Sequence, residues 1–297
     1  MQTNIELAKA RDFGEIINDT FTFIRQNFKP LVKYFFIFCG FFMLAEAAIL
    51  VLLKIRVLAF ANSITPGGFQ EDYFSRFYSL LGGYFLVFIF ILLEYTAIKV
   101  TVLCYMALYK QKQNTPPTSE EMWGYFKYFF LRILWCDFVL GLLTVAGLVF
   151  CLLPGIYLGT IFALVAPIMI VENGSFGYGF NQSFRLIKDN WWATFGVIIV
   201  VYIILYVVNL IVAIPAAILG AGNFFLHLSD GVALSLPIAI LTTVLETVAH
   251  VFQILLIVAI GFCYFNLTET KEGTGLMERM NQFGSSAPAA DSTPEEY

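Results

Sequence analysis

Charged residues are scarce in this sequence. Asp, Glu, Lys and Arg make up 13% of its 297 residues, whereas about a quarter is usual for soluble globular domains. Apolar residues reach 59%, and 32 of the residues are Phe. Aromatic side chains in such number suit lipid-facing and interfacial surfaces. This composition excludes an ordinary soluble domain and indicates a membrane protein.

The sequence also lacks an excess of basic residues. It has 17 Lys and Arg against 21 Asp and Glu, and the segment after Leu267 alone holds six acidic and two basic residues. The rest of the chain is therefore balanced. A protein that binds nucleic acid neutralises phosphates with a basic surface, so we expect no nucleic-acid partner.

Signatures of catalysis and of metal binding are missing as well. The sequence contains two histidines, five cysteines without a CxxC pair, and no GxSxG, HExxH, GxxxxGK[ST] or GxGxxG motif. These are the usual marks of hydrolases, zinc proteases and nucleotide sites. We therefore predict no catalytic residue, no metal and no cofactor, and we expect a protein that is not an enzyme.

Six long apolar stretches are present instead. About 20 apolar residues are needed to cross a bilayer as a helix, since every backbone group must then pair within the helix. The second and last stretches are overlong, and each is expected to tilt, break or extend beyond the lipid. Pro154 and Gly155 separate the third from the fourth and predict a tight hairpin. The stretches are residues 31–53, 78–109, 133–153, 155–171, 192–219 and 232–265.

These stretches predict an all-α integral membrane protein. We expect a cytoplasmic amphipathic segment at 1–30, a transmembrane domain of six helices at 31–266, and a disordered acidic tail at 267–297. If the N-terminus lies inside, the inner segments hold thirteen Lys and Arg and the outer segments hold three. Because cytoplasmic segments are rich in these residues, both termini are predicted to be cytoplasmic.

Three segments that precede a stretch have apolar residues at helical spacing, and they predict helices lying on the membrane surface. The second, near 118–130, opens with a capping-box pattern from Thr118 to Glu121. The alternative is that these helices pack on protein. The predicted surface residues of the first segment and of the third, near 176–190, are Phe13, Ile17, Phe21, Phe28, Phe176, Phe180, Phe184 and Trp191.

The first and third segments match each other at an offset of 163 residues. Phe13, Gly14 and Asn18 correspond to Phe176, Gly177 and Asn181, and further identities follow as far as Asn27 and Asn190. Amphipathic periodicity explains the apolar matches but not the Gly and Asn matches. We therefore predict an internal repeat, with parallel units of one surface helix and one membrane hairpin. The alternative is two similar helices that arose independently.

The segment 153–192 resembles a known family. Its motifs are Leu-Pro-Gly at 153–155, Ala-Pro at 166–167, Asn-Gln-Ser at 181–183 and Lys-Asp-Asn-Trp-Trp at 188–192. With Phe-Gly-Glu-Ile-Ile at 13–17, they resemble the six-helix bacterial membrane-domain superfamily that includes the membrane domain of glycerophosphoryl diester phosphodiesterases. The resemblance implies a bacterial inner-membrane location. In those phosphodiesterases a separate soluble domain carries the chemistry, so we expect no such activity here.

Ionisable residues within the apolar stretches are the candidate functional residues, because a charge inside lipid is costly. Glu94, Glu246 and His250, together with Glu46, are predicted to line a polar cavity that binds a proton, a cation or a lipid headgroup. The alternative is that they hold helices together by hydrogen bonds. Two further residues, Lys99 and Asp137, are expected to form a structural ion pair. The candidates are Glu46, Glu94, Glu246, His250, Lys99 and Asp137.

Three functions follow from these features. The first is a non-enzymatic membrane module that organises membrane lipid, a protein partner or a second copy of itself. The second is a transporter or channel for a small solute, ion or lipid that uses Glu94, Glu246 and His250 at the middle of the bilayer. The third is an intramembrane enzyme whose residues are assembled only in space.

Overall fold

The computed structural model describes residues 5–61, 73–226 and 236–273, and these residues form helices only. Six segments are long and apolar enough to cross a membrane. The predicted all-α membrane protein with six spans is therefore confirmed. The helices are α1 (Phe13–Gln26), α2 (Phe28–Ala61), α3 (Tyr73–Gln111), α4 (Ser119–Phe150), α5 (Leu152–Phe162), α6 (Val165–Val171), α7 (Phe176–Ile187), α8 (Trp191–Leu226), α9 (Leu236–Ala249), the short 3₁₀ turn η1 (His250–Phe252) and α10 (Gln253–Glu272).

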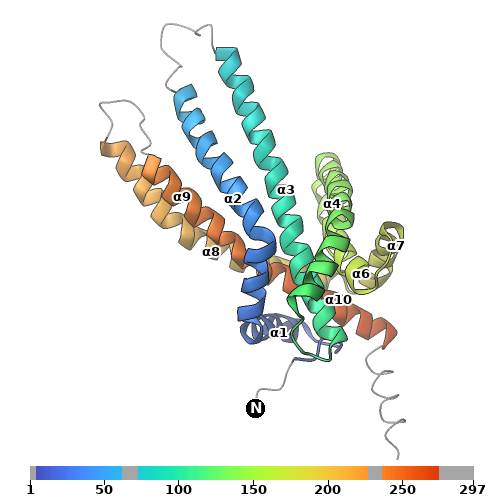
Figure 1. Cartoon of the computed structure of the whole chain (residues 1–297). Coiled ribbons are helices and arrows are strands. Elements are labelled where there is room, and N and C mark those ends of the chain that lie inside the picture. Colours follow the sequence, from blue (N-terminus) through green and yellow to red (C-terminus); the bar gives the residue numbers. More distant parts are fainter. Residues whose placement is uncertain (1–4, 62–72, 227–235, 274–297) are drawn as a thin grey trace, which may run out of the picture.

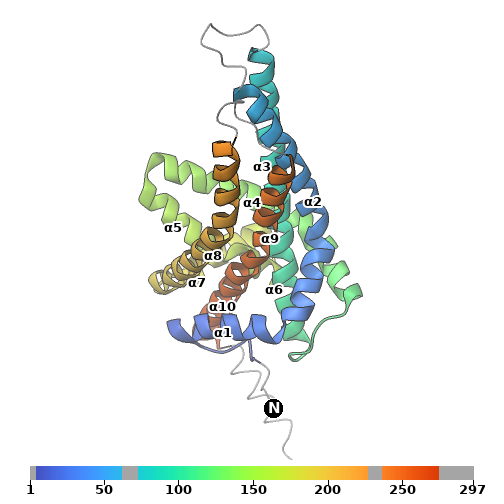
Figure 2. The same cartoon turned by 90° about the vertical axis from the view of Figure 1, so that its left-hand side faces the viewer.

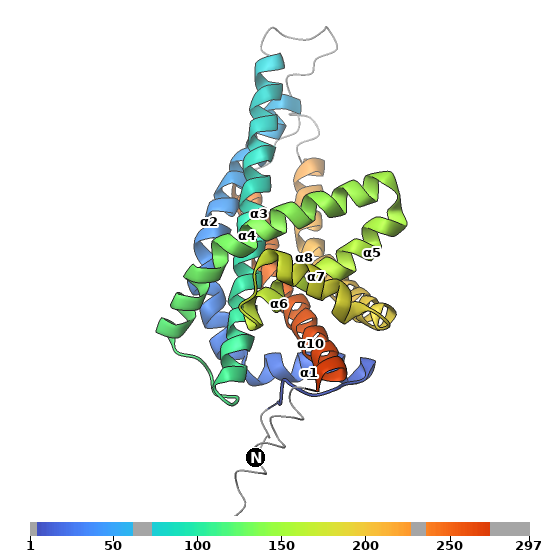
Figure 3. The ribbon, with the colours of Figure 1, turned by 90° about the vertical axis from the view of Figure 1, so that its right-hand side faces the viewer.

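The long helices form two groups. Helices α2, α3, α8 and α9 run side by side toward one end of the molecule, and the shorter helices from α5 to α7 lie beside α4 (Figure 1). Helix α1 lies across the opposite end, next to the end of α10 (Figure 2). The α4–α5 hairpin is splayed away from α3 (Figure 3). This splaying leaves α4 with few protein neighbours along its length.

The core lies near α1, where α10 and the second half of α3 are enclosed. In α10 every residue from Ile254 to Phe265 is buried. In the span that contains α10, 72% of the most apolar part is buried inside the protein. The Phe23 ring of α1 reaches into this core and packs edge-on against Phe262 of α10, with ring centroids 5.8 Å apart. The Asn27 carboxamide accepts a hydrogen bond from Tyr105 Oη at 2.7 Å. Helix α1 is thus held to both core helices.

Two of the six spans are interrupted. The fourth breaks into α5 and α6 at Ala163 and Leu164, and the sixth breaks into α9 and α10 at the 3₁₀ turn η1. Breaking was one of the three outcomes expected for the overlong last stretch, whereas the fourth was predicted as one short span. A 3₁₀ turn within a helix changes which residues share a face. The break begins at His250, so it changes which residues of α9 and α10 share a face.

Several predicted boundaries were wrong. The hairpin turns at Cys151, and Pro154 lies in the first turn of α5. Proline is tolerated there, because the backbone N–H groups of the first turn have no partner within the helix. The segment 118–130 is not a separate surface helix, since α4 continues unbroken from Ser119 to Phe150, although Thr118 and Glu121 do form the capping box. Helix α10 extends to Glu272, beyond the predicted start of the tail. The remaining tail, 274–297, lies outside the described residues.

The hairpin depends on a close approach of two glycines. A Cβ atom added at Gly147 would lie 3.1 Å from Gly155 Cα, and one added at Gly155 would lie 2.7 Å from the backbone N of Leu148. Because the second contact is with backbone, α4 and α5 would have to move apart to relieve it.

We predict that Gly155→Ala lowers the free energy of unfolding by about 1–3 kcal/mol, as overpacking of a core does. Unfolding of the detergent-solubilised protein by added SDS measures this change. Gly40→Ala is the control, because a Cβ added at Gly40 meets no atom within 4 Å. Equal stabilities for the two variants would contradict a glycine contact in the hairpin.

Candidate functional site

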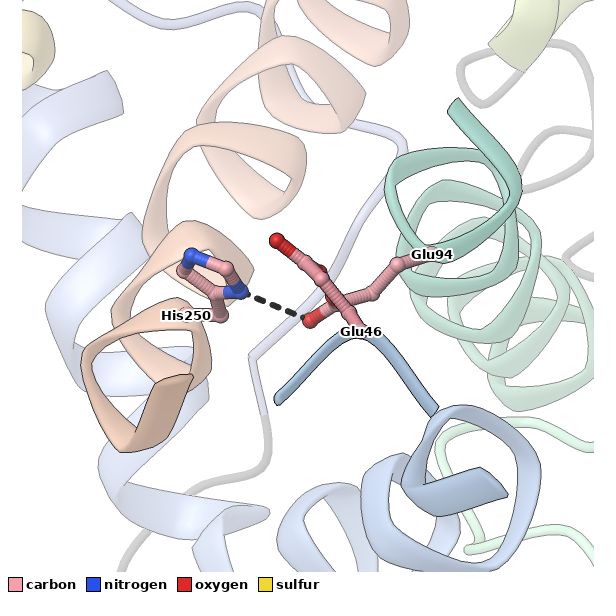
Figure 4. Close-up of side chains that lie close together, drawn as sticks. All are labelled: Glu46, Glu94 and His250. Atoms are coloured by element: carbon pink, nitrogen blue, oxygen red, sulfur yellow. Dashed lines mark hydrogen bonds and ion pairs between the residues drawn. The ribbon is translucent and has the colours of Figure 1, made fainter. Parts of the chain in front are cut away.

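Three ionisable side chains from different helices converge near the middle of the bundle (Figure 4). Glu46 comes from α2, Glu94 from α3 and His250 from η1. One potential ligand atom of each lies within 4.8 Å of those of the other two. Each residue is near the midpoint of its candidate span, so the three share one depth. We call them the carboxylate–histidine cluster.

Burial makes this cluster costly. Glu46 and Glu94 are each 2% exposed. His250 Nδ1 lies 2.8 Å from Glu94 Oε1 in a hydrogen bond. One oxygen of each carboxylate, Glu46 Oε2 and Glu94 Oε2, is buried and receives no hydrogen bond from another residue, and the two carboxylates hydrogen-bond each other only when one of them holds a proton. Buried carboxylates are normally paired or hydrogen-bonded, so this cluster is incompletely satisfied.

Glu246 does not belong to the cluster, contrary to the prediction. Its carboxylate pairs with Lys54 of α2 at 2.9 Å, and its side chain is 48% exposed. The prediction placed Glu246 and His250 four residues apart on one helical face, but Glu246 lies one turn away from His250 along the span and meets Lys54 instead. The first apolar stretch was predicted to end at residue 53, whereas α2 continues to Ala61 and brings Lys54 opposite Glu246.

Lys99 and Asp137 lie together between α3 and α4. Lys99 Nζ is 2.6 Å from Asp137 Oδ1, and Asp137 Oδ2 accepts a hydrogen bond from Thr96 Oγ1 at 3.0 Å. The Lys99 ammonium also lies 4.8 Å from the centre of the Tyr95 ring, a distance typical of a cation–π contact. Both charges are thus neutralised where the surrounding surface is apolar.

A groove of about 940 Å³ extends from this ion pair between α3, α4, α5, α8 and α10. Its volume falls within the range of roughly 300–1,000 Å³ typical of small-molecule sites. Besides Lys99 and Asp137 its walls carry the hydroxyls of two Thr and three Tyr and are otherwise apolar, with Gly141 and Gly159 where α4 and α5 face it. Exposed side chains at its edge, such as Val145 and Tyr206, show that it opens on the protein surface. The sequence did not predict this groove.

The predicted surface residues are distributed differently in α1 and α7. In α1, Phe13, Phe21 and Phe28 at the start of α2 are 43%, 45% and 56% exposed, while Ile17 is half-buried, so protein leaves this stripe largely uncovered. The predicted surface residues Phe176, Phe180, Phe184 and Trp191 are half-buried. They partly cover α5 and its neighbours, through the contacts Phe162–Phe180, Phe162–Phe184, Phe176–Phe180 and Tyr157–Trp191.

Glu172 has a structural role that sequence reasoning missed. It follows α6 and accepts hydrogen bonds from Tyr178 Oη at 2.6 Å and Tyr264 Oη at 2.8 Å. The first bond raises the pKa of Tyr178, because the carboxylate favours the protonated phenol. Glu172 thereby ties α7 to α10. The sequence shows only that Glu172 follows an apolar stretch, and nothing in that position predicts its two tyrosine partners.

The chain was compared with protein-family models, with curated proteins and with solved structures, and nothing matched. The resemblance to the six-helix bacterial membrane-domain superfamily therefore stays a prediction.

Proposed function

We propose that this protein is a non-enzymatic membrane module that organises lipid, and that the groove beside Lys99 and Asp137 holds an acyl chain of a membrane lipid. The single observation that carries this proposal is the groove itself, because it combines apolar walls with an opening on the surface. A site for a polar solute would need several convergent polar groups. Here the lining adds the hydroxyls of two Thr and three Tyr to the ion pair, whose charges already neutralise each other, and most of the groove surface is apolar.

The helices beside the groove support a lipid occupant. The spans formed by α4 and by the first part of α8 are the least buried of the six, because protein covers only 17% of the most apolar part of each. Surfaces of this kind, in a span, contact acyl chains. The groove therefore opens where lipid is the neighbouring medium, and an acyl chain enters it without crossing water.

The exposed stripe of α1 supports a membrane-surface role for that helix. A helix with one apolar stripe on protein and another uncovered suits the boundary between headgroups and acyl chains. Asp12 and Ser175, which are 163 residues apart, cap α1 and α7 with their side chains, and each of these helices leads within a few residues into a span. These features support the proposed internal repeat. They favour parallel units that each begin with a surface helix.

The distribution of charge supports a cytoplasmic location for both ends of the chain. Helix α1 and the end of α10 lie at the same end of the bundle (Figure 1), and Arg11 N donates a hydrogen bond to Asn266 Oδ1 at 2.7 Å. Lys9, Arg25 and Lys271 belong to this end, as expected for the cytoplasmic side. The proposed location in a bacterial inner membrane rests on the family resemblance.

A tryptophan placed in the groove tests the lipid proposal. Gly141 lines the groove and a Cβ added there meets no atom within 4 Å, so Gly141→Trp fills the groove without a backbone clash. We expect native mass spectrometry of the wild-type protein to show a retained lipid adduct, and the Gly141→Trp protein to lose most of it. Gly82→Trp is the matched control, since Gly82 of α3 is exposed, equally open and outside the groove. Equal lipid retention by both variants would contradict the proposal.

A transporter for a small solute or ion is the second candidate function. The observation that favours it is the convergence of Glu46, Glu94 and His250 at the middle of three spans, one of which is broken there. Discontinuous helices near the bilayer midplane are common where transporters bind ions. This candidate requires flux across the membrane, whereas a lipid-organising module does not.

A further inference from the structure

We propose that Glu46, Glu94 and His250 bind one divalent transition-metal ion, with Zn²⁺ as the representative of its class. This site is separate from the lipid groove and does not depend on the proposed function. It departs from the sequence-based prediction of no metal, which rested on the absence of metal-binding motifs.

The ligand types fit such an ion. One imidazole nitrogen and two carboxylate oxygens form a mixed nitrogen–oxygen set, which suits Zn²⁺ and Mn²⁺ better than a soft metal. Three protein ligands leave a further coordination position open. Of the residues described by the structure, these are the only three His, Cys, Asp or Glu residues whose ligand atoms gather in this way.

The distances also fit, with a small adjustment. The three ligand atoms lie within 4.8 Å of one another. Two ligands of one tetrahedral Zn²⁺ ion at about 2.1 Å each lie about 3.4 Å apart. Closing the longest separation takes a shift of about 1.4 Å, which a change in the side-chain torsions of a Glu provides. In Figure 4 both carboxylates and Nδ1 of His250 face one another.

The unsatisfied oxygens point independently to a ligand. Glu46 Oε2 and Glu94 Oε2 are buried in residues that are 2% exposed, and the only hydrogen bond within their reach is one between the two carboxylates, which requires a shared proton. Among the described residues, no Lys or Arg forms an ion pair with either carboxylate. Lys54, on the same helix as Glu46, is engaged by Glu246.

The charge balance explains why a divalent ion is favoured. Two adjacent carboxylates in a medium of low polarity repel each other and lack the solvation that water supplies. A divalent cation neutralises both charges and uses the lone pairs left without partners. A proton shared by the two carboxylates is the rival arrangement, since it removes one charge and leaves the cluster without a metal.

The break in the sixth span supports a built site. His250 begins a 3₁₀ turn between α9 and α10, and such turns within long helices often mark functional positions. Glu246 of α9 meets Lys54 of α2, whereas His250, one turn further along the span, meets Glu94 of α3, so the two residues make separate polar contacts.

Metal binding by the full-length chain tests the proposal. The protein is purified in detergent through a tag without histidine, treated with EDTA, exposed to Zn²⁺ and freed of unbound metal. We expect one Zn²⁺ per chain by mass spectrometry of the metal. Loss of a ligand in Glu46→Gln, Glu94→Gln or His250→Ala is expected to weaken Zn²⁺ binding at least tenfold, since even partners of ligands contribute about 10–100-fold. Glu246→Gln, the matched control outside the cluster, keeps the wild-type stoichiometry and affinity.

X-ray absorption of the wild-type protein decides the case if the variants fold poorly. We expect only nitrogen and oxygen neighbours at about 2.0–2.2 Å from Zn²⁺. A sulfur neighbour at about 2.3 Å would place the metal on cysteine and overturn the proposal. Failure of the wild-type protein to retain Zn²⁺, or wild-type affinity in all three folded cluster variants, would overturn it as well. If the two carboxylates hold only a shared proton, the wild-type protein will not retain Zn²⁺.

Discussion

Replacement of Asp137 by alanine is expected to lower the free energy of unfolding by about 3–5 kcal/mol, as the loss of one partner of a buried ion pair does. The Lys99 and Asp137 side chains are 16% and 11% exposed, so little solvent is available to replace the lost partner. The variant leaves the Lys99 ammonium beside apolar groove walls, and it removes the acceptor of the Thr96 hydroxyl. Unfolding by SDS in mixed micelles measures the change.

A double variant separates the ion pair from simple loss of packing. Lys99→Met combined with Asp137→Leu removes both charges and keeps apolar volume. Because apolar replacement of a whole buried pair is often neutral or stabilising, we expect the double variant to be more stable than either single variant. If the stability loss of the double variant equals the sum of the losses of the two single variants, the charges do not interact.

Replacement of Arg11 by methionine is expected to cost about 3 kcal/mol or more. The Arg11 side chain is 1% exposed and pairs with Asp19 Oδ2 at 2.8 Å. It also donates to the backbone oxygens of residues 6, 7 and 9 and lies 4.8 Å from the centre of the Phe262 ring. Methionine fills the space but satisfies none of these acceptors. Helix α1 is then expected to separate from α10, and faster hydrogen exchange over α1 reports that separation.

Lys9→Met is the matched control for Arg11→Met. Lys9 pairs with Glu15 at 3.3 Å, but the two side chains are 50% and 46% exposed. An exposed ion pair of this kind contributes roughly 0–1 kcal/mol. Similar losses for the two variants would contradict the role of Arg11 as the residue that ties the N-terminal segment to the core.

The spans were predictable from the sequence because the cost of unpaired backbone in lipid imposes long apolar helices. The residues at which the helices begin and end were less predictable. The local sequence favoured a turn at Pro154 and Gly155, and no residue near Cys151 indicated that the helix ends there. The close contact of Gly147 with Gly155 is a tertiary feature that fixes the hairpin only after the chain has folded.

The candidate site was predictable in its residue types and less so in its membership. Charges within apolar stretches identified Glu46, Glu94 and His250 as well as Lys99 and Asp137. Helical periodicity assigned Glu246 to the same face as His250, but Glu246 lies one turn away along the span and pairs with Lys54. The groove was not predictable, because it arises from the splaying of α4 and α5, which depends on packing between helices distant in sequence.

Photocrosslinking in a bilayer tests the lipid proposal most directly. The protein is reconstituted with a phospholipid whose acyl chain carries a diazirine, irradiated, and mapped by peptide mass spectrometry. We predict that adducts concentrate on groove residues such as Val145 and Tyr206, and that Gly141→Trp removes them. Adducts spread equally over exposed positions outside the groove, such as Phe41 and Leu44 of α2, and unchanged by Gly141→Trp, would contradict a groove that holds lipid.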